Sequence, residues 1–445
     1  MRPGGRRPHP VLVAGKTTGV LLLLLLALPL NLALTAAALL TSRRKAAQPA
    51  GQPAGQRKTI LISGGKMTKA LQLARSFHAA GHRVILVESA RYRLTGHRFS
   101  RAVDRFRIVP KPQAPGYAEA LLAIVRAENV DVYVPVCSPV SSYYDALAKP
   151  LLTPYCEVLH EDADMIRKLD DKYEFSVLAA SLGLPVPDAH RISSPGQVEE
   201  FDFAGAGQRY ILKSIGYDPV NRLDLTSLPR PSASATAAFA QSKPIAADRP
   251  WILQGLVAGR EYCAHSTVRD GQVQVYCCCE SSAFQVNYEM ADKPEIEAWV
   301  RRFVAPLKLT GQVSFDFIEG EDGQVYAIEC NPRTHSAITM FYNHPGLARA
   351  YLDRDVSAIE PAAGARPTYW LYHEIWWLIT QPGRAARLRT IWRGKDAIFD
   401  RADPLPFLLV HHLQIPWLLL QNLVRGKDWI RIDFNIGKLV EPAGD

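Results

Sequence analysis

The first 57 residues lack acidic side chains altogether. The same stretch holds eight basic residues, so it carries most of the formal net charge of +9. Of the 52 basic residues in the chain of 445, the other 44 lie in the body, against 43 acidic ones. This balanced charge argues against nucleic acid as a partner of the body. The basic tail, residues 1–17, is a separate feature.

Cysteine is scarce and lacks metal-binding spacing. The seven cysteines include no Cys-x-x-Cys pair, which argues against a zinc site. An odd number without a disulfide-like spacing fits a reducing compartment. Three thiols are consecutive, Cys277–Cys279, but neighbouring side chains of a strand point to opposite faces. We therefore interpret them as buried strand residues rather than as a metal or redox site.

Charge is absent from residues 17–42, most of which are apolar. Such a run is long enough to span a bilayer. We interpret residues 18–41 as a hydrophobic membrane segment, either an anchor or, because of Pro29 and Asn31, a hairpin or interfacial segment. A cleaved signal peptide is the alternative, since small residues end the apolar run. Residues 42–57 are rich in Ala, Gly, Pro and Gln, which is typical of a flexible linker.

The body begins with the pattern of a doubly wound α/β domain. A buried strand is followed by Gly64-Gly65 and an apolar-periodic helix, and strand and helix patterns continue to residue 155. This order predicts a parallel sheet over residues 58–155. A ligand carboxylate or phosphate could bind at Gly65, Lys66 or Thr68, and ordinary turn chemistry is the equal alternative. The Gly-x-Gly-x-x-Gly fingerprint is absent, so nicotinamide binding is a weak expectation.

A hairpin pattern lies further along the chain, with Asp322-Gly323 as its predicted two-residue turn. A hairpin centred on that dipeptide places Asp316 directly opposite Glu329, and Asn331 projects from the same face. Like charges opposed across two strands repel, so a compensating group is expected. Three oxygen ligands on one rigid face suit Mg²⁺, a metal that is commonly shared with substrate phosphates. A solvated sheet face is the alternative.

The order of these parts resembles that of the ATP-grasp ligases. One lysine, Lys172, precedes a helix–strand unit, and a second, Lys213, lies within a strand; a Gly-x-Glu-Tyr turn and the Glu-x-Asn-Pro-Arg hairpin follow. The resemblance implies an ATP-grasp fold, α/β and α+β, with an N-terminal parallel-sheet domain preceded by the apolar membrane segment. It implies a small lysine-bearing subdomain over 156–256 and a metal-binding subdomain over 257–355. A Trp-rich C-terminal region, 356–445, lies outside the common core.

The same resemblance assigns roles residue by residue, with ATP and Mg²⁺ as cofactors and Mn²⁺ as a substitute metal. It implies that Lys172 and Lys213 contact the ATP phosphates, and that the segment Gln254, Gly255, Leu256 and Val257 faces the adenine. It implies that Glu261 binds the ribose and that Arg333 contacts the transferred phosphoryl group. The implied metal ligands are Asp316, Glu329 and Asn331. His335 could orient the acceptor or act as a base, and a structural role in its loop is equally open.

Two positions depart from the family pattern. The segment after Lys213 has one glycine where many members carry a glycine-rich flap, so Ser214 and Arg222 are the candidates for covering the phosphates. Ser314 stands where peptide-type members have an arginine, which argues against a dipeptide ligase.

A narrower resemblance points to the mycosporine-glycine synthases of mycosporine-like amino acid biosynthesis. The segments that carry it are 63–88, 277–288 and 331–339. It implies that ATP phosphorylates an enol-type oxygen of 4-deoxygadusol, a cyclohexenone, and that glycine then displaces phosphate. ATP use implies a membrane-anchored chain with its catalytic body in the cytoplasm. The alternatives are a carboxylate–amine ligase that forms an acylphosphate and a membrane-tethered nucleotide-binding regulatory protein.

The C-terminal region mixes tryptophan and arginine. Its apolar segment 416–424 is predicted to be too short to span a bilayer. Packing of this region against the ligase core is the ordinary interpretation. Binding at a membrane surface is the alternative, because tryptophan and arginine mix in the same way at lipid interfaces.

Overall fold

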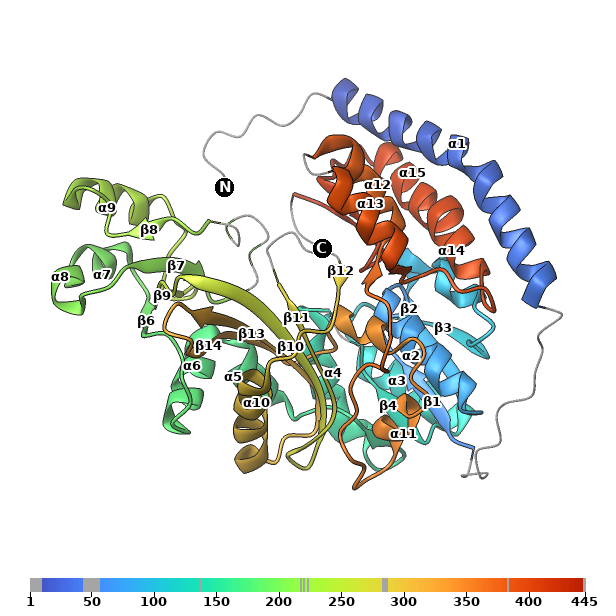
Figure 1. Ribbon diagram of the computed structural model, residues 1–445, viewed down its shortest axis with the longest axis horizontal. Helices are drawn as coiled ribbons and strands as arrows, with labels where there is room; N and C mark the ends of the chain where they lie inside the picture. The colour runs from blue at the N-terminus through green and yellow to red at the C-terminus, as the bar shows by residue number, and fades with distance from the viewer. Residues whose placement is uncertain are drawn as a thin grey trace.

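The computed structural model describes residues 10–42, 57–136, 138–216, 218, 221, 224–281, 287–381 and 384–442. Among these residues the strands form three larger sheets and two small ones, and a helical layer lies at one side (Figure 1).

The N-terminal part is the predicted parallel α/β domain. Its five strands are paired in the order β3-β2-β1-β4-β5. The elements are β1 (Thr59–Ile62), α2 (Thr68–Ala79), β2 (Arg83–Ser89), β3 (Arg105–Val109), α3 (Tyr117–Glu128), β4 (Val132–Val134), α4 (Ser141–Leu152) and β5 (Glu157–Val158). Alternate residues of β1 pack in two different apolar cores, Ile60 and Ile62 with α2 and Leu61 with α3 and α4. Both faces of the sheet are therefore covered, as a parallel sheet requires. The strand order reverses at β1, which leaves a crevice beyond the carboxyl ends of the strands.

A small antiparallel sheet carries Lys213. Its strand order is β6-β9-β7-β8. The strands are β6 (Ala189–Ile192), β7 (Tyr210–Ser214), β8 (Ser227–Leu228) and β9 (Trp251–Gly255), and the helices packed near them are α7 (Pro195–Glu199), α8 (Phe203–Ala206) and α9 (Ala233–Gln241). Tyr210, Leu212 and Trp251 form the centre of its core.

A larger antiparallel sheet, β11-β10-β13-β14, carries the predicted metal hairpin. The strands are β10 (Gly259–Arg269), β11 (Gln272–Glu280), β13 (Gly311–Gly320) and β14 (Val325–Asn331). Helix α10 (Pro294–Leu307) covers one face with an aromatic cluster that includes Phe303 and Phe315, whose ring centroids are 5.3 Å apart. Cys278 lies on this face, whereas Cys277 and Cys279 lie on the other, and all three are buried and free. The interpretation of the three thiols as buried strand residues is confirmed.

One predicted helix is two helices. The sequence pattern predicts a single helix from Asp162 to Gly183, but α5 (Ala163–Asp170) ends before α6 (Lys172–Ser181) begins. The break is at Asp171, whose φ and ψ are −80° and 112° and whose carboxylate accepts from the N–H groups of Tyr173 and Glu174. An aspartate that caps a new helix offers the backbone an alternative to continuation. The break makes Lys172 the first residue of α6.

The C-terminal region packs on the N-terminal domain. Its elements are β15 (Thr368–Tyr369), α12 (Leu371–Thr380), α13 (Arg384–Arg393), β16 (Lys395–Asp396), α14 (Leu405–Leu409), η5 (Val410–Gln414), α15 (Ile415–Val424), β17 (Arg431–Asp433) and β18 (Lys438–Val440). Before residue 356 the chain also forms β12 (Asn287–Tyr288), η4 (Ser336–Phe341) and α11 (Leu347–Leu352), and β12 and β16 both pair with β15. Trp370 is buried and its indole N–H donates to Thr68 of α2 at 3.0 Å. Trp392, by contrast, is 84 % exposed. Packing against the body therefore explains some of the tryptophans and not others.

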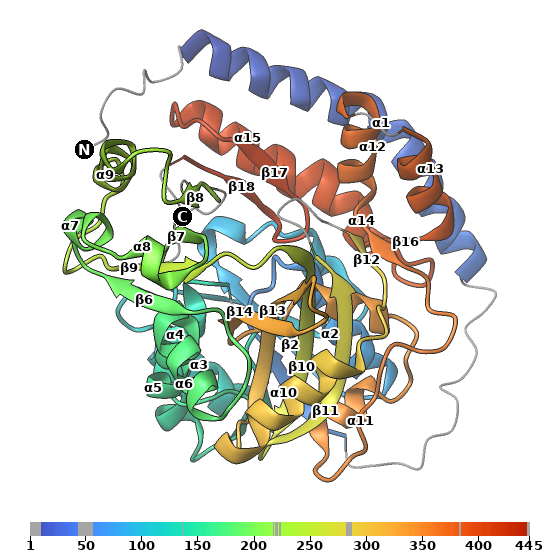
Figure 2. The ribbon, with the colours of Figure 1, turned by 60° about the vertical axis from the view of Figure 1, so that its left-hand side comes forward.

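Two helical segments, Val11–Ser42 and Leu405–Val424, are long and apolar enough to cross a membrane. The second corrects an expectation, because the apolar segment 416–424 continues back through η5 and α14 to a total of 20 residues. The first is α1 (Pro10–Ser42), which is longer than the predicted segment 18–41 and is helical through Pro29. It lies along α14 and α15 in both views (Figures 1 and 2). Most of the predicted linker, residues 43–56, is outside the described residues.

Phe303→Ala is expected to destabilise the large-sheet part by about 3–5 kcal/mol, because Phe303 is fully buried and its loss leaves a cavity among aromatic rings. Chemical unfolding followed by near-ultraviolet circular dichroism measures this change. Leu388→Ala on α13 is the matched control, since Leu388 is 55 % exposed, and it should change the free energy of unfolding by less than about 0.5 kcal/mol. Equal losses in the two variants would contradict the assignment of this core.

Candidate phosphate and metal site

The predicted pairing of Asp316 with Glu329 and of Ser314 with Asn331 is confirmed. The turn differs from the prediction, because Gly320 N–H donates to the Gln324 carbonyl at 2.9 Å, which closes a three-residue loop. Gly323 supplies the positive φ of 76° that this loop needs. The longer loop offsets the register near the turn by one residue. A β-bulge on the partner strand removes that offset before the carboxylates are reached.

The bulge residue is Ile328, the one residue of β14 between Ala327 and Glu329 without a partner on β13. Its carbonyl accepts from the Gln254 amide at 3.1 Å, and the amide oxygen of Gln254 accepts from Lys213 Nζ at 3.1 Å. Gln254 is almost fully buried at the end of β9. Its side chain therefore joins the small sheet to the large sheet and orients the lysine between them.

Asn331 lies between the two carboxylates. Its Nδ2 donates to Asp316 Oδ2 at 3.1 Å and to Glu329 Oε1 at 3.2 Å. Its Oδ1 accepts from the Arg333 guanidinium. The N–H₂ group of Asn331 thus places two hydrogen-bond donors between carboxylates that would otherwise face each other directly.

The two carboxylates differ in charge state. Burial, with the negative charge of Glu329 adding to it, raises the pKa of Asp316 to about 7. Burial also raises the pKa of Glu329, but Lys172, Lys213 and Arg333 outweigh it and lower that pKa to about 2. At neutral pH the pair therefore holds between one and two negative charges, because Arg333 and Lys213 act on Asp316 too weakly to offset its burial and the charge of Glu329.

The donor set fits a hard divalent cation. Among the described residues no group of three His, Cys, Asp or Glu side chains could hold a metal. A site here therefore needs Asn331 as its third protein ligand, with the remaining positions filled by water or substrate oxygen. The pKa of Asp316 is raised because its negative charge is poorly compensated, so a positive charge beside it would be stabilised.

Two lysines approach this pair from different elements. Lys172 Nζ is 3.3 Å from Glu329 Oε2 and donates to the Ile215 carbonyl at 3.5 Å. Burial lowers the pKa of Lys213, with Lys172 adding to it, while Glu329 and Asp316 act in the opposite direction. Both lysines were predicted, and the structure brings both to the hairpin.

Arg333 is held by a residue that sequence reasoning missed. Its Nη1 is 3.1 Å from Asp170 Oδ1, at the end of α5. Burial raises the pKa of Asp170, and the positive charge of Arg333 opposes that rise. The acidic run Asp170-Asp171 is visible in the sequence, but it does not by itself indicate a partner for Arg333.

His335 is placed as a cap of η4. Its Nδ1 accepts from the Ala337 N–H at 3.3 Å. Burial, together with the charges of Lys69 and Arg333, lowers its pKa to about 3. A neutral imidazole with Nδ1 occupied carries its proton on Nε2, so this geometry favours the structural role and a hydrogen-bond donor over a base.

The predicted adenine residues lie at and just after the end of β9 in the small sheet, and the predicted ribose residue, Glu261, lies on β10 of the large sheet. The N–H groups of Gly255 and Leu256 already donate to the carbonyls of Asp188 and Arg209, both at 2.7 Å. An adenine at this segment would thus use its other backbone groups, including those of Val257. Glu261 is exposed on β10, and its charge acts on Lys213. Ser214, next to Lys213 on β7, faces the opposite side by strand alternation, and Arg222 lies outside the described residues.

The N-terminal domain holds the loop that follows the hairpin. The Pro332 carbonyl accepts from Ser142 Oγ at 2.7 Å, and the Thr334 carbonyl accepts from Lys69 Nζ. Thr334 Oγ1 donates to the buried Gln312 at 2.6 Å. The position of Arg333 in this loop therefore depends on α2 and α4 as well as on the large sheet.

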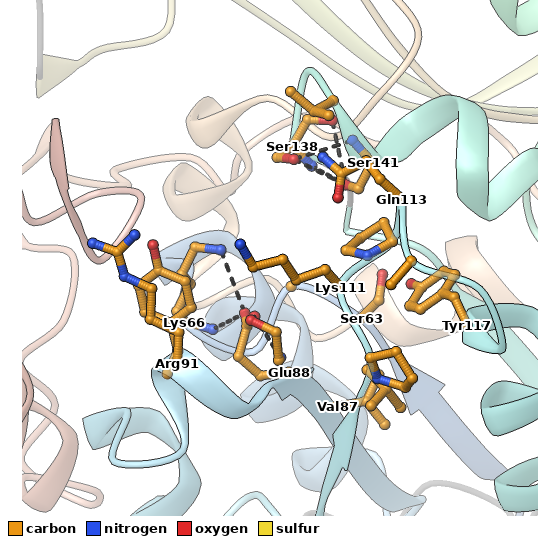
Figure 3. A pocket seen from close by; sticks show the side chains of 18 of the residues that line it. Ser63, Lys66, Val87, Glu88, Arg91, Lys111, Gln113, Tyr117, Ser138 and Ser141 are labelled. Atoms are coloured by element: carbon orange, nitrogen blue, oxygen red, sulfur yellow. Dashed lines mark hydrogen bonds and ion pairs between the residues drawn. The ribbon is translucent and has the colours of Figure 1, made fainter. Parts of the chain in front are cut away.

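A cavity of about 470 Å³ lies beyond the carboxyl ends of β1–β4, where the strand order reverses (Figure 3). Three cationic residues, Lys66, Arg91 and Lys111, line it together with one carboxylate, Glu88. Lys66 Nζ is 3.7 Å from Glu88 Oε2. Of the residues proposed for an anion from the sequence, Lys66 lines the cavity and Thr68 does not, since its hydroxyl accepts from Trp370 instead.

The cavity and the loop that carries Arg333 (the Arg333 loop, Pro332–Thr334) share their supporting helices. Ser141 lines the cavity and Ser142 holds Pro332; Met67 lines it and Lys69 holds Thr334. A ligand in the cavity would therefore contact one side of the α2 and α4 helix ends, and the Arg333 loop contacts the other side.

Solved structures resemble this chain in fold. N5-carboxyaminoimidazole ribonucleotide synthetase in its ADP complex is 15 % identical, with a TM-score of 0.53 over 70 % of this chain and 80 % of that one. Carboxyaminoimidazole ribonucleotide synthase from Aspergillus clavatus, complexed with ATP, is 15 % identical with a TM-score of 0.50 over 70 % of this chain and 80 % of that one. Biotin carboxylase from Campylobacter jejuni, in a β,γ-ATP complex, is 15 % identical with a TM-score of 0.50 over 67 % and 72 %. No protein-family model and no curated protein matches the sequence. The likeness shows that the fold is ATP-grasp, as predicted.

Asp316→Asn is expected to stabilise the metal-free protein, because an unfolded aspartate ionises near pH 4 while folded Asp316 resists ionisation up to about pH 7. The wild-type loses stability across that interval, and the variant does not. The gain should thus grow between about pH 4 and about pH 7 and stay constant above, as measured by urea unfolding in a chelator. Asp164→Asn, at a 95 % exposed carboxylate, is the control. A gain that does not vary with pH would contradict a raised pKa at Asp316.

Proposed function

We propose that the chain is an ATP- and Mg²⁺-dependent ligase that forms a carbon–nitrogen bond. The observation that carries this proposal is the convergence of Lys172, Lys213 and Arg333 on the Asp316–Glu329 pair. Phosphoryl transfer needs neutralisation of polyphosphate charge and in-line positioning, which such a set of charges supplies. Neighbours of the same fold were crystallised with ADP or ATP, which supports a nucleotide as the ligand.

In this proposal Lys172 and Lys213 hold the ATP phosphates, Gln254–Val257 the adenine and Glu261 the ribose. Asp316, Glu329 and Asn331 would hold Mg²⁺, or Mn²⁺ with the same oxygen ligands. When bound, the metal supplies charge neutralisation between the phosphates. Asn331 has to turn its amide to present its oxygen, which releases Arg333 from that oxygen. The freed guanidinium can then stabilise the transferred phosphoryl group.

We further propose glycine and 4-deoxygadusol as the acceptors, on the strength of the sequence motifs. The γ-phosphoryl group of ATP passes to the ring enol oxygen and ADP leaves. The glycine nitrogen then bonds to the same ring carbon, the carbon–oxygen bond breaks, phosphate leaves and the amine loses a proton. Part of one supporting motif, residues 282–286, lies outside the described residues.

The cavity of the N-terminal domain is the proposed acceptor site. The enolate of a cyclohexenone is an anion. Lys66 pairs with Glu88 and Arg91 with Glu441, so Lys111 supplies the excess positive charge of the cavity. The cavity borders the helices that hold the Arg333 loop, so an acceptor there would approach the phosphates.

A carboxylate–amine ligase that forms an acylphosphate is the second candidate. The same cationic cavity would attract a carboxylate, which is the observation that favours it. Against it, Ser314 gives the site face a hydroxyl in place of a guanidinium, and that hydroxyl donates to the Asn331 carbonyl at 3.2 Å. Since either ligase needs ATP, we propose a cytoplasmic catalytic body attached to the membrane through the segment 18–41.

Release of ADP by the full chain tests the proposal. The assay contains Mg-ATP, 4-deoxygadusol and glycine, and each acceptor is left out in turn. Release that needs both acceptors, with a new ultraviolet-absorbing product, is the expected result. Release with simple carboxylic acids and an amine would favour the second candidate. Nucleotide binding without turnover of any acceptor would point to the membrane-tethered regulatory protein.

Glu329→Gln is expected to lower kcat at least about a hundredfold, because it removes one of the two charges that would hold the metal. The thermal unfolding curve should stay cooperative, which shows that the fold is kept. Glu321→Gln, at an exposed carboxylate in the loop of the same hairpin, is the matched control and should retain the wild-type rate. Full activity in Glu329→Gln would remove the metal assignment.

Lys111→Ala is expected to raise the KM of the anionic acceptor about tenfold, since a charge-assisted contact is worth about 1.5–3 kcal/mol and Lys111 is exposed. With the acceptor at saturating concentration the KM of ATP should not change, because Lys111 is separate from Lys172 and Lys213. Lys168→Ala, an exposed lysine of α5, controls for the lost charge. An unchanged acceptor KM would place the acceptor elsewhere without affecting the ATP assignment.

A further inference from the structure

Helix α1 is docked on the body along its length. Four of its buried positions, Thr17, Leu24, Asn31 and Ala38, are at most 5 % exposed and recur every seven residues, and Thr35, one turn after Asn31, is buried as well. A seven-residue repeat keeps one face of a helix against its partner. The partner is the α14–η5–α15 segment, which lies beside α1 in both views (Figures 1 and 2).

Polar contacts fix both halves of α1 on the C-terminal region. Lys16 Nζ donates to the Trp429 carbonyl at 2.5 Å and lies 3.7 Å from the centroid of the same indole. Fifteen residues further on, Asn31 Nδ2 lies 2.5 Å from Tyr372 Oη and 2.6 Å from His412 Nε2. Side chains paired in this way hold α1 in one register on the C-terminal region.

The segment under α1 belongs to the core of the body. Val410 and Leu419 are fully buried. The Gln414 amide accepts from the Gly96 N–H at 2.9 Å and donates to the Gly437 carbonyl at 2.9 Å. This segment cannot enter a bilayer without leaving the N-terminal domain, so a helix docked along it cannot stand across the bilayer either.

We propose that α1 lies in the plane of one membrane leaflet and that the protein is bound to that leaflet without crossing it. A helix of 33 residues is about 50 Å long, more than the hydrocarbon core of about 30 Å needs. Its outward leucines are 42–77 % exposed; they are Leu22, Leu23, Leu25, Leu26, Leu30, Leu32, Leu34 and Leu40.

The neighbouring helices extend this surface. α12 and α13 lie on the same side of the molecule as α1 (Figures 1 and 2). Ile379 and Trp392 are 67 % and 84 % exposed there, and Arg389 and Arg393 are exposed beside them. Exposed tryptophan and leucine mixed with arginine suit the headgroup region of an anionic leaflet. The bilayer is therefore the occupant that the chemistry of this surface selects.

Labelling of the two ends of α1 in the full chain tests the proposal. Val11→Cys and Thr41→Cys place thiols at exposed positions, and wild-type chain is the background because its described cysteines are buried. In sealed inside-out bacterial vesicles, both variants should react equally with a membrane-impermeant maleimide before detergent is added. Reaction of Thr41→Cys alone shows a spanning helix and overturns the proposal. Reaction of neither, while the body is open to added protease, overturns it as well.

A depth measurement separates the leaflet from other occupants. Leu26→Cys, Trp392→Cys and Asp164→Cys receive an environment-sensitive dye and are mixed with phosphatidylcholine–phosphatidylglycerol vesicles that carry a lipid-borne quencher. The first two should be quenched, and Asp164→Cys, on the distant α5, should not (Figure 1). Quenching at Leu26→Cys alone means that α1 has left the body. No quenching, together with elution as a dimer, means that a second copy covers α1. Either result overturns the proposal.

Discussion

Repulsion between Asp316 and Glu329 is the constraint around which the rest of the site is arranged. Two carboxylates directly opposite each other in a sheet destabilise it unless positive charge is brought close. Lys172, Lys213 and Arg333 meet this need at Glu329, and the amide of Asn331 meets it in part at Asp316. The cations come from α6, the small sheet and the loop after β14, so these three elements must pack together for the pair to be tolerated. The negative charge of Asp316 is not fully neutralised by these groups, and a bound metal ion would neutralise the rest.

The local parts of this site could be predicted from the sequence, because they depend on neighbours in the chain. Strand alternation and one turn signal were sufficient to place Asp316 opposite Glu329. They were sufficient partly because two errors cancelled: the turn holds one residue more than predicted, and the bulge at Ile328 takes up that residue. A bulge has no reliable sequence signal, since it depends on what the bulged carbonyl meets, here the amide of Gln254.

The tertiary parts of the site could not be predicted. Asp170, Lys69 and Ser142 come from three helices, and nothing in their own sequence surroundings points to Arg333 or to its loop. The helix break at Asp171 follows the same rule, because apolar periodicity continues through it and only the capping contact reveals it. The apolar run 18–41 was visible at once, but whether it stands across a membrane or lies along the body depends on partners about 340 to 410 residues away.

The N-terminal domain holds the Arg333 loop through Lys69 and Ser142, and this contact has a consequence for how two ligands affect each other's binding. Helices α2 and α4 each carry a cavity-lining residue and, one or two residues further on, a residue that grips the loop. A ligand that orders these helix ends from one side reduces the conformational entropy that is lost when a second ligand binds on the other side. Occupancy of the cavity and alignment of the guanidinium are then two aspects of one equilibrium. By thermodynamic reciprocity, acceptor and nucleotide would each tighten the binding of the other, and unproductive loss of phosphate to water would be slow until both are present.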